Sequence, residues 1–378
     1  MKVAFCIRDT YLTEHGGDVT QMLKTKTYLE NTHGIQIEIL TNPEDLDKSF
    51  DIAHVFNFST VECSQKFVLK AKKEGIKIAF STIYWDYSYV PISRILKFFR
   101  FNLTPLTAQI CILACKAVAL VLQRPMLLSN RFRKHIRLIV ELSDVLLPNS
   151  VEEAEKFIDF AKPNKDKTII KTHVVPNATD FTDVEESKDI CTLYKIPKNY
   201  ILQVGRIEFI KGQLQTIKAL EKNPEIPIVF VGRIVEQDYW KQVENRAKKR
   251  GNVFFIPEVP HSDVQHFYKS ASLHILPSLR ESPGLVSLEA LSNGCKIVVA
   301  NKNFTPCDTY FKDIASICNP LSVKNIRKNI LQEIKMNRNT SQIKEVVKAK
   351  FSWEAAAKET YMAYCRIFEN QNKKTKTT

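Results

Sequence analysis

The sequence predicts an α/β protein with two domains, each built on a parallel sheet. Its 378 residues exceed what one core of ordinary size supports, and about 100–200 residues per domain gives two domains. Short apolar segments alternate with amphipathic segments in two separate stretches, and strands joined by helical crossovers form parallel sheets covered on both faces. With 44% hydrophobic and 25% charged residues, the composition is typical of a soluble globular protein.

The first third of the chain carries the first of these alternations. A loop with the sequence HGGDV (15–19) follows the first apolar segment. We expect this stretch to form one α/β domain. Its expected strands and helices are 2–7, 19–31, 35–40, 51–58, 62–73 and 76–82.

The same alternation resumes after residue 195 and predicts the second domain. The acidic, weakly periodic stretch 176–190 is the best candidate for the connection between the two domains. A final helix is expected at 352–369, with Ser352 as its N-cap. The other expected elements are 200–205, 213–221, 226–232, 236–249, 252–257, 262–270, 271–277 and 296–300.

A net charge of +14 indicates an anionic partner, for which nucleic acid, anionic lipid and phosphorylated small molecules all qualify. The segment 91–140 concentrates this charge, with nine Lys or Arg and no Asp or Glu. Thr104 and Pro105 open an apolar helix there, ending before Pro125. Lys116 at its centre would cost about 2.5–3.5 kcal/mol in a bilayer, so we favour an interfacial helix that binds anionic lipid. An internal helix with a solvated basic face is an equal alternative.

Cysteine usage indicates a reducing compartment. The nine cysteines are an odd number, are never spaced Cys-x-x-Cys and mostly stand in apolar runs. No secretion signal is recognisable at the start of the chain, because the apolar run ends at Arg8. We therefore expect a cytoplasmic protein, peripheral on the cytoplasmic face of the membrane. No aromatic-interleaved RNA motif or zinc module supports nucleic acid as the partner.

Two loops follow parallel strands of the second domain, where open α/β sheets bind ligands. In the first, a strand ends at Gly205, Arg206 follows, and Lys211 with Gly212 precedes a helix. Arginine offers a flat fork for two phosphate oxygens and lysine a mobile point charge, so the pair suits a diphosphate without magnesium. Taken alone, one Arg and one Lys in a surface loop are usually only solvated.

The second loop opens the stretch ESPGLVSLEALSNG (281–294). We expect Ser282 as N-cap, Pro283 as the first helical residue and Gly284 next, leaving backbone N–H groups open to an anion. Eight helical steps would put Glu289 about 10–12 Å from Glu281, about the span from sugar to ribose in a nucleotide sugar. Either glutamate alone is more often a dipole-offsetting or solvated residue.

These two loops carry a family resemblance. The stretch 277–300 resembles the nucleotide-sugar signature of the retaining glycosyltransferases of family 4, with its Glu-x7-Glu motif. VGRIEFIKG (204–212) resembles the Gly-Arg…Lys-Gly loop of that family, and VVPNATD (174–180) its Val-Pro-Asn-Gly-Val-Asp step. DVLLPNS (144–150) and FSW (351–353) also stand where the family has similar short motifs.

The resemblance implies the GT-B fold, two Rossmann-like domains with parallel sheets facing a cleft. We place the acceptor-side domain at 1–183, with 91–140 as its membrane-facing segment, and the nucleotide-sugar domain at 184–354. The last helix, 355–370, would return to the first domain. The tail 371–378 is expected to be disordered.

By the same resemblance, Arg206 and Lys211 hold and stabilise the leaving diphosphate, Glu281 contacts the donor sugar, and these three are the catalytic residues. Glu289 binds the ribose. No metal or other cofactor is implied, and retention proceeds without a stable protein-bound intermediate. The implied donor-binding residues are Gly16, Gly17, Gly205, Arg206, Lys211, Glu281, Pro283, Gly284, Leu285 and Glu289.

On the acceptor side the chain departs from the family. Many relatives have a histidine after the strand equivalent to 76–82, where this chain has Tyr84, Trp85 and Asp86. Asp86 could position an acceptor hydroxyl, and the aromatic rings could stack on a sugar. An aromatic cluster after a strand is more often packing.

The leading hypothesis is a retaining glycosyltransferase that moves a sugar from a UDP- or GDP-sugar to a lipid-linked saccharide in bacterial cell-surface polysaccharide synthesis. A nucleotide-sugar epimerase of the same fold is one alternative. A non-catalytic sugar-nucleotide or lipid-binding scaffold is another.

Overall fold

The computed structural model describes residues 1–14, 16–85, 106, 110, 113, 130–181 and 188–375. The described chain forms two compact units. Unit 1 contains Met1–Trp85, the residues from 130 to Ala178, and the chain from Lys350 onward, whereas unit 2 runs from Thr179 to Ala349. The boundary expected between 183 and 184 lies five residues further along the chain than the one between Ala178 and Thr179.

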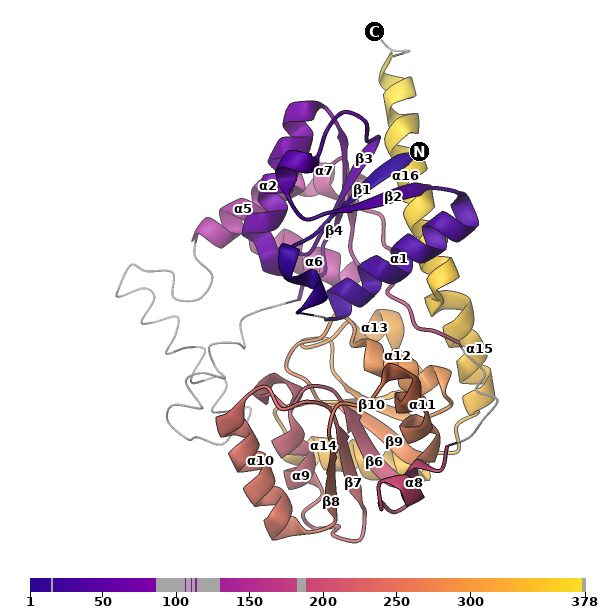
Figure 1. Cartoon of the computed structure of the whole chain (residues 1–378). Coiled ribbons are helices and arrows are strands. Elements are labelled where there is room, and N and C mark those ends of the chain that lie inside the picture. The colour runs from indigo at the N-terminus through magenta and orange to yellow at the C-terminus, as the bar shows by residue number, and fades with distance from the viewer. Residues whose placement is uncertain are drawn as a thin grey trace. The chain divides into compact units, whose positions relative to one another are not determined.

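Unit 1 is built on a five-stranded parallel sheet with the order β2-β1-β3-β4-β5 (Figure 1). Every neighbouring pair is parallel, and the register of the first pair matches Val3 with Ile37. Four of the strands lie where apolar segments were expected. The strands are β1 (Lys2–Cys6), β2 (Gln36–Leu40), β3 (Ile52–Phe56), β4 (Lys77–Ser81) and β5 (Val145–Leu147).

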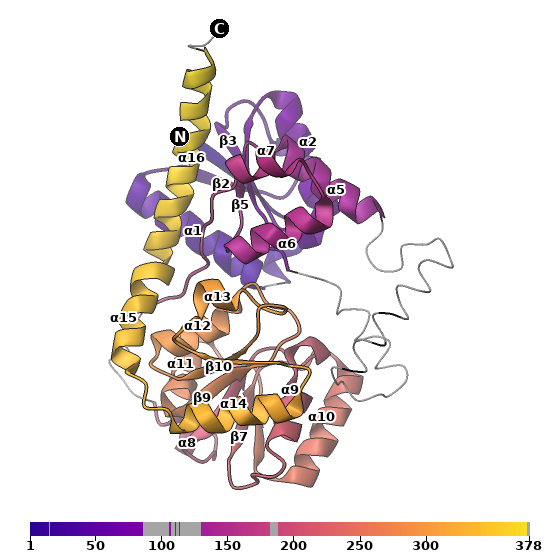
Figure 2. The same cartoon turned by 180° about the vertical axis from the view of Figure 1, so that it is seen from behind.

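Helices cover both faces of the unit 1 sheet (Figures 1 and 2). On one face, Val3 and Phe5 pack with Met22 of α1 and Ala357 of α16 in one apolar core. On the other face, α2 lies against β3 and β4 and also contacts α5. The helices are α1 (Gly17–His33), α2 (Val61–Glu74), α5 (Asn130–Leu142), α6 (Val151–Ala161), α7 (Lys165–Ile170) and α16 (Trp353–Thr375).

Unit 2 is built on a six-stranded parallel sheet with the order β11-β10-β9-β6-β7-β8. Its strands, short and mostly buried, are β6 (Tyr200–Val204), β7 (Ile228–Val231), β8 (Val253–Ile256), β9 (Ala271–Leu276), β10 (Ile297–Ala300) and β11 (Ser316–Cys318). Continuous apolar strands are typical of a sheet with helices on both faces. The order β9-β6-β7 places the carboxyl ends of β6 and β9 side by side, which brings the two candidate loops together.

The helices of unit 2 form two layers. Apolar side chains of α9, α10 and α14 pack on one face of the sheet, while α11 and α12 lie against β9 on the other (Figure 2). The helices are α8 (Ile190–Leu193), α9 (Gln213–Ala219), α10 (Gln237–Arg250), α11 (His261–Ser270), α12 (Leu285–Ser292), α13 (Cys307–Tyr310), α14 (Val323–Lys335) and α15 (Thr340–Phe351).

The α/β class with two parallel sheets is confirmed, but the C-terminal end needs a correction. Ser352 is the N-cap of α16 as expected, since its Oγ accepts the Ala355 N–H at 3.3 Å. The expected disordered tail 371–378 is helical as far as Thr375. Gln371, Lys373 and Lys374 have favourable helix propensity, which supports this extension.

Most of the segment 91–140, like Asp86, lies outside the described residues. Its described end belongs to α5, where Arg137 donates from Nε to the carbonyl of Ala161 at 3.0 Å. The Arg133 guanidinium lies 5.5 Å from the centre of the Phe160 ring. In the described part of the chain, none of the helices combines the length and apolarity needed to cross a membrane.

Candidate functional site

Two glycines shape the loops that leave β6 and β7. Gly205 and Gly232 have φ values of 140° and 145°, which side chains rarely adopt. A Cβ on Gly232 would lie 2.4 Å from the carbonyl oxygen of Gly205. The backbones of the two loops therefore touch, and this close approach sets the starting direction of Arg206.

Arg206 is held by a neighbour that sequence reasoning missed. One carboxylate oxygen of Glu208, Oε1, lies 2.9 Å from Nη2 of Arg206 and 3.1 Å from Nε. The side chain of Glu208 is 10% exposed and that of Arg206 47% exposed. The arginine therefore stands at the surface on a buried anionic support. The alternation of charge in RIE was the only sequence signal for this contact.

Lys211 and Glu281 meet across two loops. Lys211 Nζ lies 2.5 Å from Glu281 Oε1, and the side chains are only 16% and 10% exposed. The loops are joined directly, because the Leu279 N–H donates to the carbonyl of Ile210 at 2.8 Å. The resemblance assigned both residues to one donor site, and the structure places them in contact.

Glycine is also required at position 212, directly after Lys211. Gly212 has a φ of 73°, and a Cβ there would lie 2.7 Å from the carbonyl oxygen of Pro277. The chain after Lys211 is therefore pressed against the end of β9. Because both constraints exclude larger residues, the Lys-Gly pair keeps the ammonium group fixed next to Glu281.

Helix α12 begins later than expected. Gly284, with a φ of 91°, is its N-cap, and the helix runs from Leu285 to Ser292. Ser282 is therefore not the N-cap and Pro283 is not the first helical residue; the peptide bond between them is cis. A Cβ on Gly284 would meet a methyl carbon of Leu276 at 2.8 Å, so the turn needs glycine.

This shift changes the geometry of the glutamate pair but keeps an open helix head. The first four steps after Glu281 are not helical, so the span calculated from helical rise does not apply to them. Amides of the first turn of a helix have no intrahelical partner, and those of Leu285 and Val286 stand at this position. They remain available to an anion beside Glu281.

Glu289 is oriented by helix α11. Its Oε2 accepts a hydrogen bond from the Tyr268 hydroxyl at 3.2 Å, and its Oε1 lies 3.2 Å from Nε2 of His261. Burial, followed by the charge of Glu289, raises the pKa of the Tyr268 phenol. Tyr268 thus stays a hydrogen-bond donor, which fixes the carboxylate.

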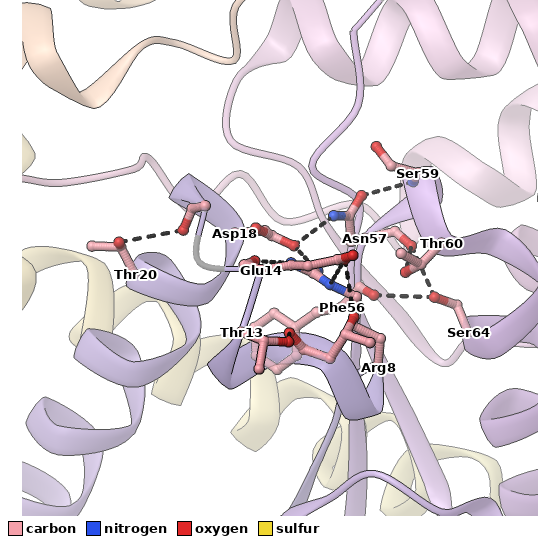
Figure 3. Close-up of polar contacts among 12 residues, drawn as sticks. Arg8, Thr13, Glu14, Asp18, Thr20, Phe56, Asn57, Ser59, Thr60 and Ser64 are labelled. Atoms are coloured by element: carbon pink, nitrogen blue, oxygen red, sulfur yellow. Dashed lines mark hydrogen bonds and ion pairs between the residues drawn. The ribbon is translucent and has the colours of Figure 1, made fainter. Parts of the chain in front are cut away.

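In unit 1, Gly16 is the N-cap of α1 and Gly17 its first residue, so this helix begins two residues before the expected 19–31. A polar cluster lies next to this start, at the ends of β1 and β3 (Figure 3). Arg8 forms an ion pair with Asp18, and Asn57 Nδ2 donates to the same carboxylate oxygen at 2.9 Å. A Cβ on Gly16 would lie 2.9 Å from the other carboxylate oxygen of Asp18. A side chain at Gly16 would therefore have to displace the carboxylate of Asp18.

The aromatic residues after β4 are buried. Tyr84 and Trp85 are 1% and 3% exposed, and the Tyr84 ring packs edge-on against Phe58. The Tyr84 N–H donates at 3.0 Å to Glu153 Oε1, which also accepts from the Thr82 hydroxyl. This arrangement favours the packing alternative for Tyr84, and the acceptor role of the pair stays a prediction.

Two of the motifs that resemble the family contribute side chains to one buried amide cluster. Gln21 Nε2 donates to Asn149 Oδ1 at 2.9 Å, and Asn177 Nδ2 donates to Gln21 Oε1 at 3.1 Å. Asn149 stands in DVLLPNS and Asn177 in VVPNATD. Hydrogen bonds from these two motifs therefore connect α1, the end of β5 and the segment that leaves unit 1.

His54 in unit 1 and His274 in unit 2 are neutral histidines buried in the cores. Burial lowers the pKa of both His54 and His274 to about 3. His54 contacts the Tyr364 hydroxyl at 2.6 Å and the Ser81 hydroxyl at 2.8 Å, whereas neither ring nitrogen of His274 has a partner among the described residues. Both are core residues rather than bases.

The similarity to known sequences falls mainly in unit 2. Residues 192–349 match the family model described as glycosyl transferases group 1. The chain is 30% identical over 176 residues to an O-antigen chain mannosyltransferase B of Escherichia coli, covering 44% of this chain and 46% of that protein. It is 26% identical over 186 residues to a D-inositol 3-phosphate glycosyltransferase of Thermobifida fusca, with 44% and 42% covered. The chain thus spans less than half of these curated relatives.

Solved structures extend the likeness to the whole chain. The HepE protein of Anabaena in complex with UDP aligns with a TM-score of 0.69 at 16% identity, covering 97% of this chain and 100% of that chain. Sucrose-phosphate synthase of Thermosynechococcus elongatus aligns with a TM-score of 0.74 at 15% identity, with 98% and 100% covered. At these identities the likeness shows the fold, which is GT-B.

Proposed function

We propose that the protein is a retaining glycosyltransferase that takes a sugar from a UDP- or GDP-sugar. The observation that carries this proposal is the contact between Lys211 and Glu281 beside the half-exposed Arg206, at adjacent carboxyl ends of β6 and β9. Open α/β sheets bind ligands at this edge. The match of residues 192–349 to the group 1 family, and the Escherichia coli mannosyltransferase, support the same activity.

The site contains the charges that departure of a nucleoside diphosphate requires. Arg206 and Lys211 would neutralise the negative charge that develops on the leaving diphosphate, and fixed charges need no reorganisation during the reaction. The amides at the head of α12 would add hydrogen bonds to a phosphate. Two cations and a helix head together suffice for a diphosphate, and we propose that no metal takes part.

Glu281 has two tasks in this proposal. Its carboxylate keeps Lys211 in place through the 2.5 Å contact, and its second oxygen would accept a hydrogen bond from a donor-sugar hydroxyl. Glu289, fixed by Tyr268, would accept hydrogen bonds from the ribose. The acceptor would attack from the side of the leaving group, with a phosphate oxygen taking its proton, which retains the configuration of the sugar.

The acceptor is proposed to be a lipid-linked saccharide at the cytoplasmic face of an anionic membrane. The charge of +14 supports an anionic surface, and Leu106, Ile110 and Leu113, four and three residues apart, are 66%, 55% and 65% exposed. A helix with apolar residues on one side and cationic flanks binds such surfaces. The O-antigen enzyme among the relatives fits a role in cell-surface polysaccharide synthesis.

The test begins with thermal stabilisation of the full chain by a panel of UDP-, GDP- and ADP-sugars. A ligand at 100 times its Kd adds about 2.7 kcal/mol, which gives a clear rise in Tm. Transfer from the stabilising donor is then measured for Arg206→Ala and Glu281→Ala, with Lys2→Ala as a control outside unit 2. We expect both site variants to lose most turnover. Undiminished turnover in both would remove the assignment of the site.

A further inference from the structure

Glu208 is a buried acid with no role in the chemistry proposed above. It lies two residues after Arg206, and its side chain is 10% exposed. Buried carboxylates are rare unless they are paired, and this one is paired with Arg206. Its position beside a residue that would hold the diphosphate makes the pairing informative.

The contacts occupy one edge of the arginine and leave the other. Nε and Nη2 both point to Oε1 of Glu208, at 3.1 and 2.9 Å. A guanidinium has a second edge, formed by Nη1 and the remaining hydrogen of Nη2, that can bind two oxygens at once. Nη1 has no hydrogen bond or ion pair within the described part of the chain. The edge suited to a phosphate therefore faces away from the carboxylate.

The backbone around the pair is already fixed. Gln213 Nε2 donates to the carbonyl of Arg206 at 2.8 Å, and Gln203 Nε2 donates to that of Lys211 at 2.7 Å. Thr216 in turn donates to Gln203 Oε1 at 2.8 Å. Because the loop is anchored in this way, the side chain of Arg206 is the part that still needs orientation, and Glu208 supplies it.

We propose that Glu208 is a positioning residue that aims the free edge of Arg206 at the diphosphate of the donor, an inference that rests on the proposed function. Two effects of this carboxylate oppose each other. Its charge repels a phosphate, but the guanidinium lies between them. Its hydrogen bonds order a long side chain in advance, and the entropy of that ordering is otherwise lost on binding.

The experiment measures selectivity for a diphosphate over a monophosphate. Calorimetry on the full chain gives Kd for UDP and UMP, and in parallel for GDP and GMP. We expect Glu208→Ala to lower the diphosphate preference by about 10-fold, as for loss of one charge-assisted hydrogen bond, without changing the Kd of the monophosphate. Glu208→Gln retains an oxygen that accepts the same bonds, so it should restore most of the preference.

Two further variants separate positioning from general stability. Glu221, two residues beyond the end of α9, pairs with Arg246 of α10, so Glu221→Ala removes a similar ion pair and should leave the preference unchanged. Arg206→Ala should remove at least as much of the preference as Glu208→Ala, because it removes the group that binds the diphosphate. Combining the two should cost nothing more, because Glu208 acts through Arg206.

The outcomes are distinguishable. A wild-type chain that binds neither UDP nor GDP overturns the proposed function and this inference with it. A wild-type preference for the diphosphate that survives in Glu208→Ala overturns the inference alone. A preference that rises in Glu208→Ala means that the carboxylate competes with the diphosphate, which also overturns it, as does an additive loss in the double variant.

Discussion

The loops at the carboxyl ends of the strands differ between the two units. In unit 2, Arg206 is half exposed and its charge faces outward from a buried carboxylate. In unit 1, Arg8 and Asp18 are 13% and 11% exposed and form an ion pair, and Asp18 also accepts a hydrogen bond from Asn57 (Figure 3). The same edge of the same kind of sheet thus leaves an arginine half exposed in unit 2 and pairs its arginine with an aspartate in unit 1. A charged cluster at a strand end indicates ligand binding only when part of it stays unsatisfied.

The largest effect is expected from Lys211→Ala, which removes the cation of unit 2 that meets Glu281. We expect kcat to fall by about 100- to 1,000-fold, as for loss of one group that stabilises charge in a transition state. Steady-state kinetics on the stabilising donor measures it. Lys248→Ala is the control, since that side chain is 70% exposed on α10. An equal loss in both variants would contradict a special role for Lys211.

Mutation of the Arg8, Asp18 and Asn57 cluster of unit 1 should instead change the stability of the protein. Asp18→Ala leaves Arg8 and Asn57 without their shared acceptor, and we expect it to lower the free energy of unfolding by about 2–3 kcal/mol. Urea unfolding measures this change. Glu38→Ala, whose carboxylate is 57% exposed and pairs with Lys2 at 3.6 Å, should change it by less than about 0.5 kcal/mol. Unchanged stability with lost transfer would instead place Asp18 at the substrate.

The buried histidines His54 and His274 extend the comparison to the cores. His54→Leu leaves the hydroxyls of Tyr364 and Ser81 unpaired and should cost about 2 kcal/mol of unfolding free energy. His274→Leu removes a ring without partners among the described residues, so the change should stay within about 1 kcal/mol. Thermal unfolding at pH 7.5 compares the variants. Equal losses would mean that the contacts of His54 contribute nothing.

Acid should destabilise both units through these rings. A histidine with a pKa of about 3 when folded and about 6.5 when unfolded stabilises the protein fully above pH 6.5, and this contribution is lost as pH falls toward 3. At pH 5.5 each ring should cost about 1 kcal/mol relative to pH 6.5. Urea unfolding at several pH values in this range gives the free energy of unfolding as a function of pH. This free energy should fall less steeply with decreasing pH for His274→Leu than for wild type. Parallel slopes would refute the shifted pKa of His274.

Much of the fold could be predicted because the strands are continuous apolar runs. Segments such as 200–205 and 296–300 can only be buried strands between helices, and β6 and β10 lie there. Strands β5 and β11, of three residues each, are too short to give a pattern. The start of α12 was missed because a Ser-Pro step typically opens a helix, whereas here Gly284 takes the N-cap.

The site was predictable only in part. Arg206, Lys211 and Glu281 could be named from motifs, but the contact of Lys211 with a residue 70 positions away depends on strand order. Glu208 was missed because an acid beside an arginine looks like an ordinary surface pair until its burial is known. Burial is a property of the folded loop and leaves no mark in local sequence.

The amide cluster of Gln21, Asn149 and Asn177 has a consequence for how the chain leaves unit 1. Amide groups neither titrate nor carry charge, so ionic strength and acidity leave their hydrogen bonds intact. The ion pairs elsewhere in unit 1, in contrast, weaken with salt and with protonation of their carboxylates. The hydrogen bonds that hold the chain where it leaves unit 1 should therefore persist when the ionic strength or the pH changes.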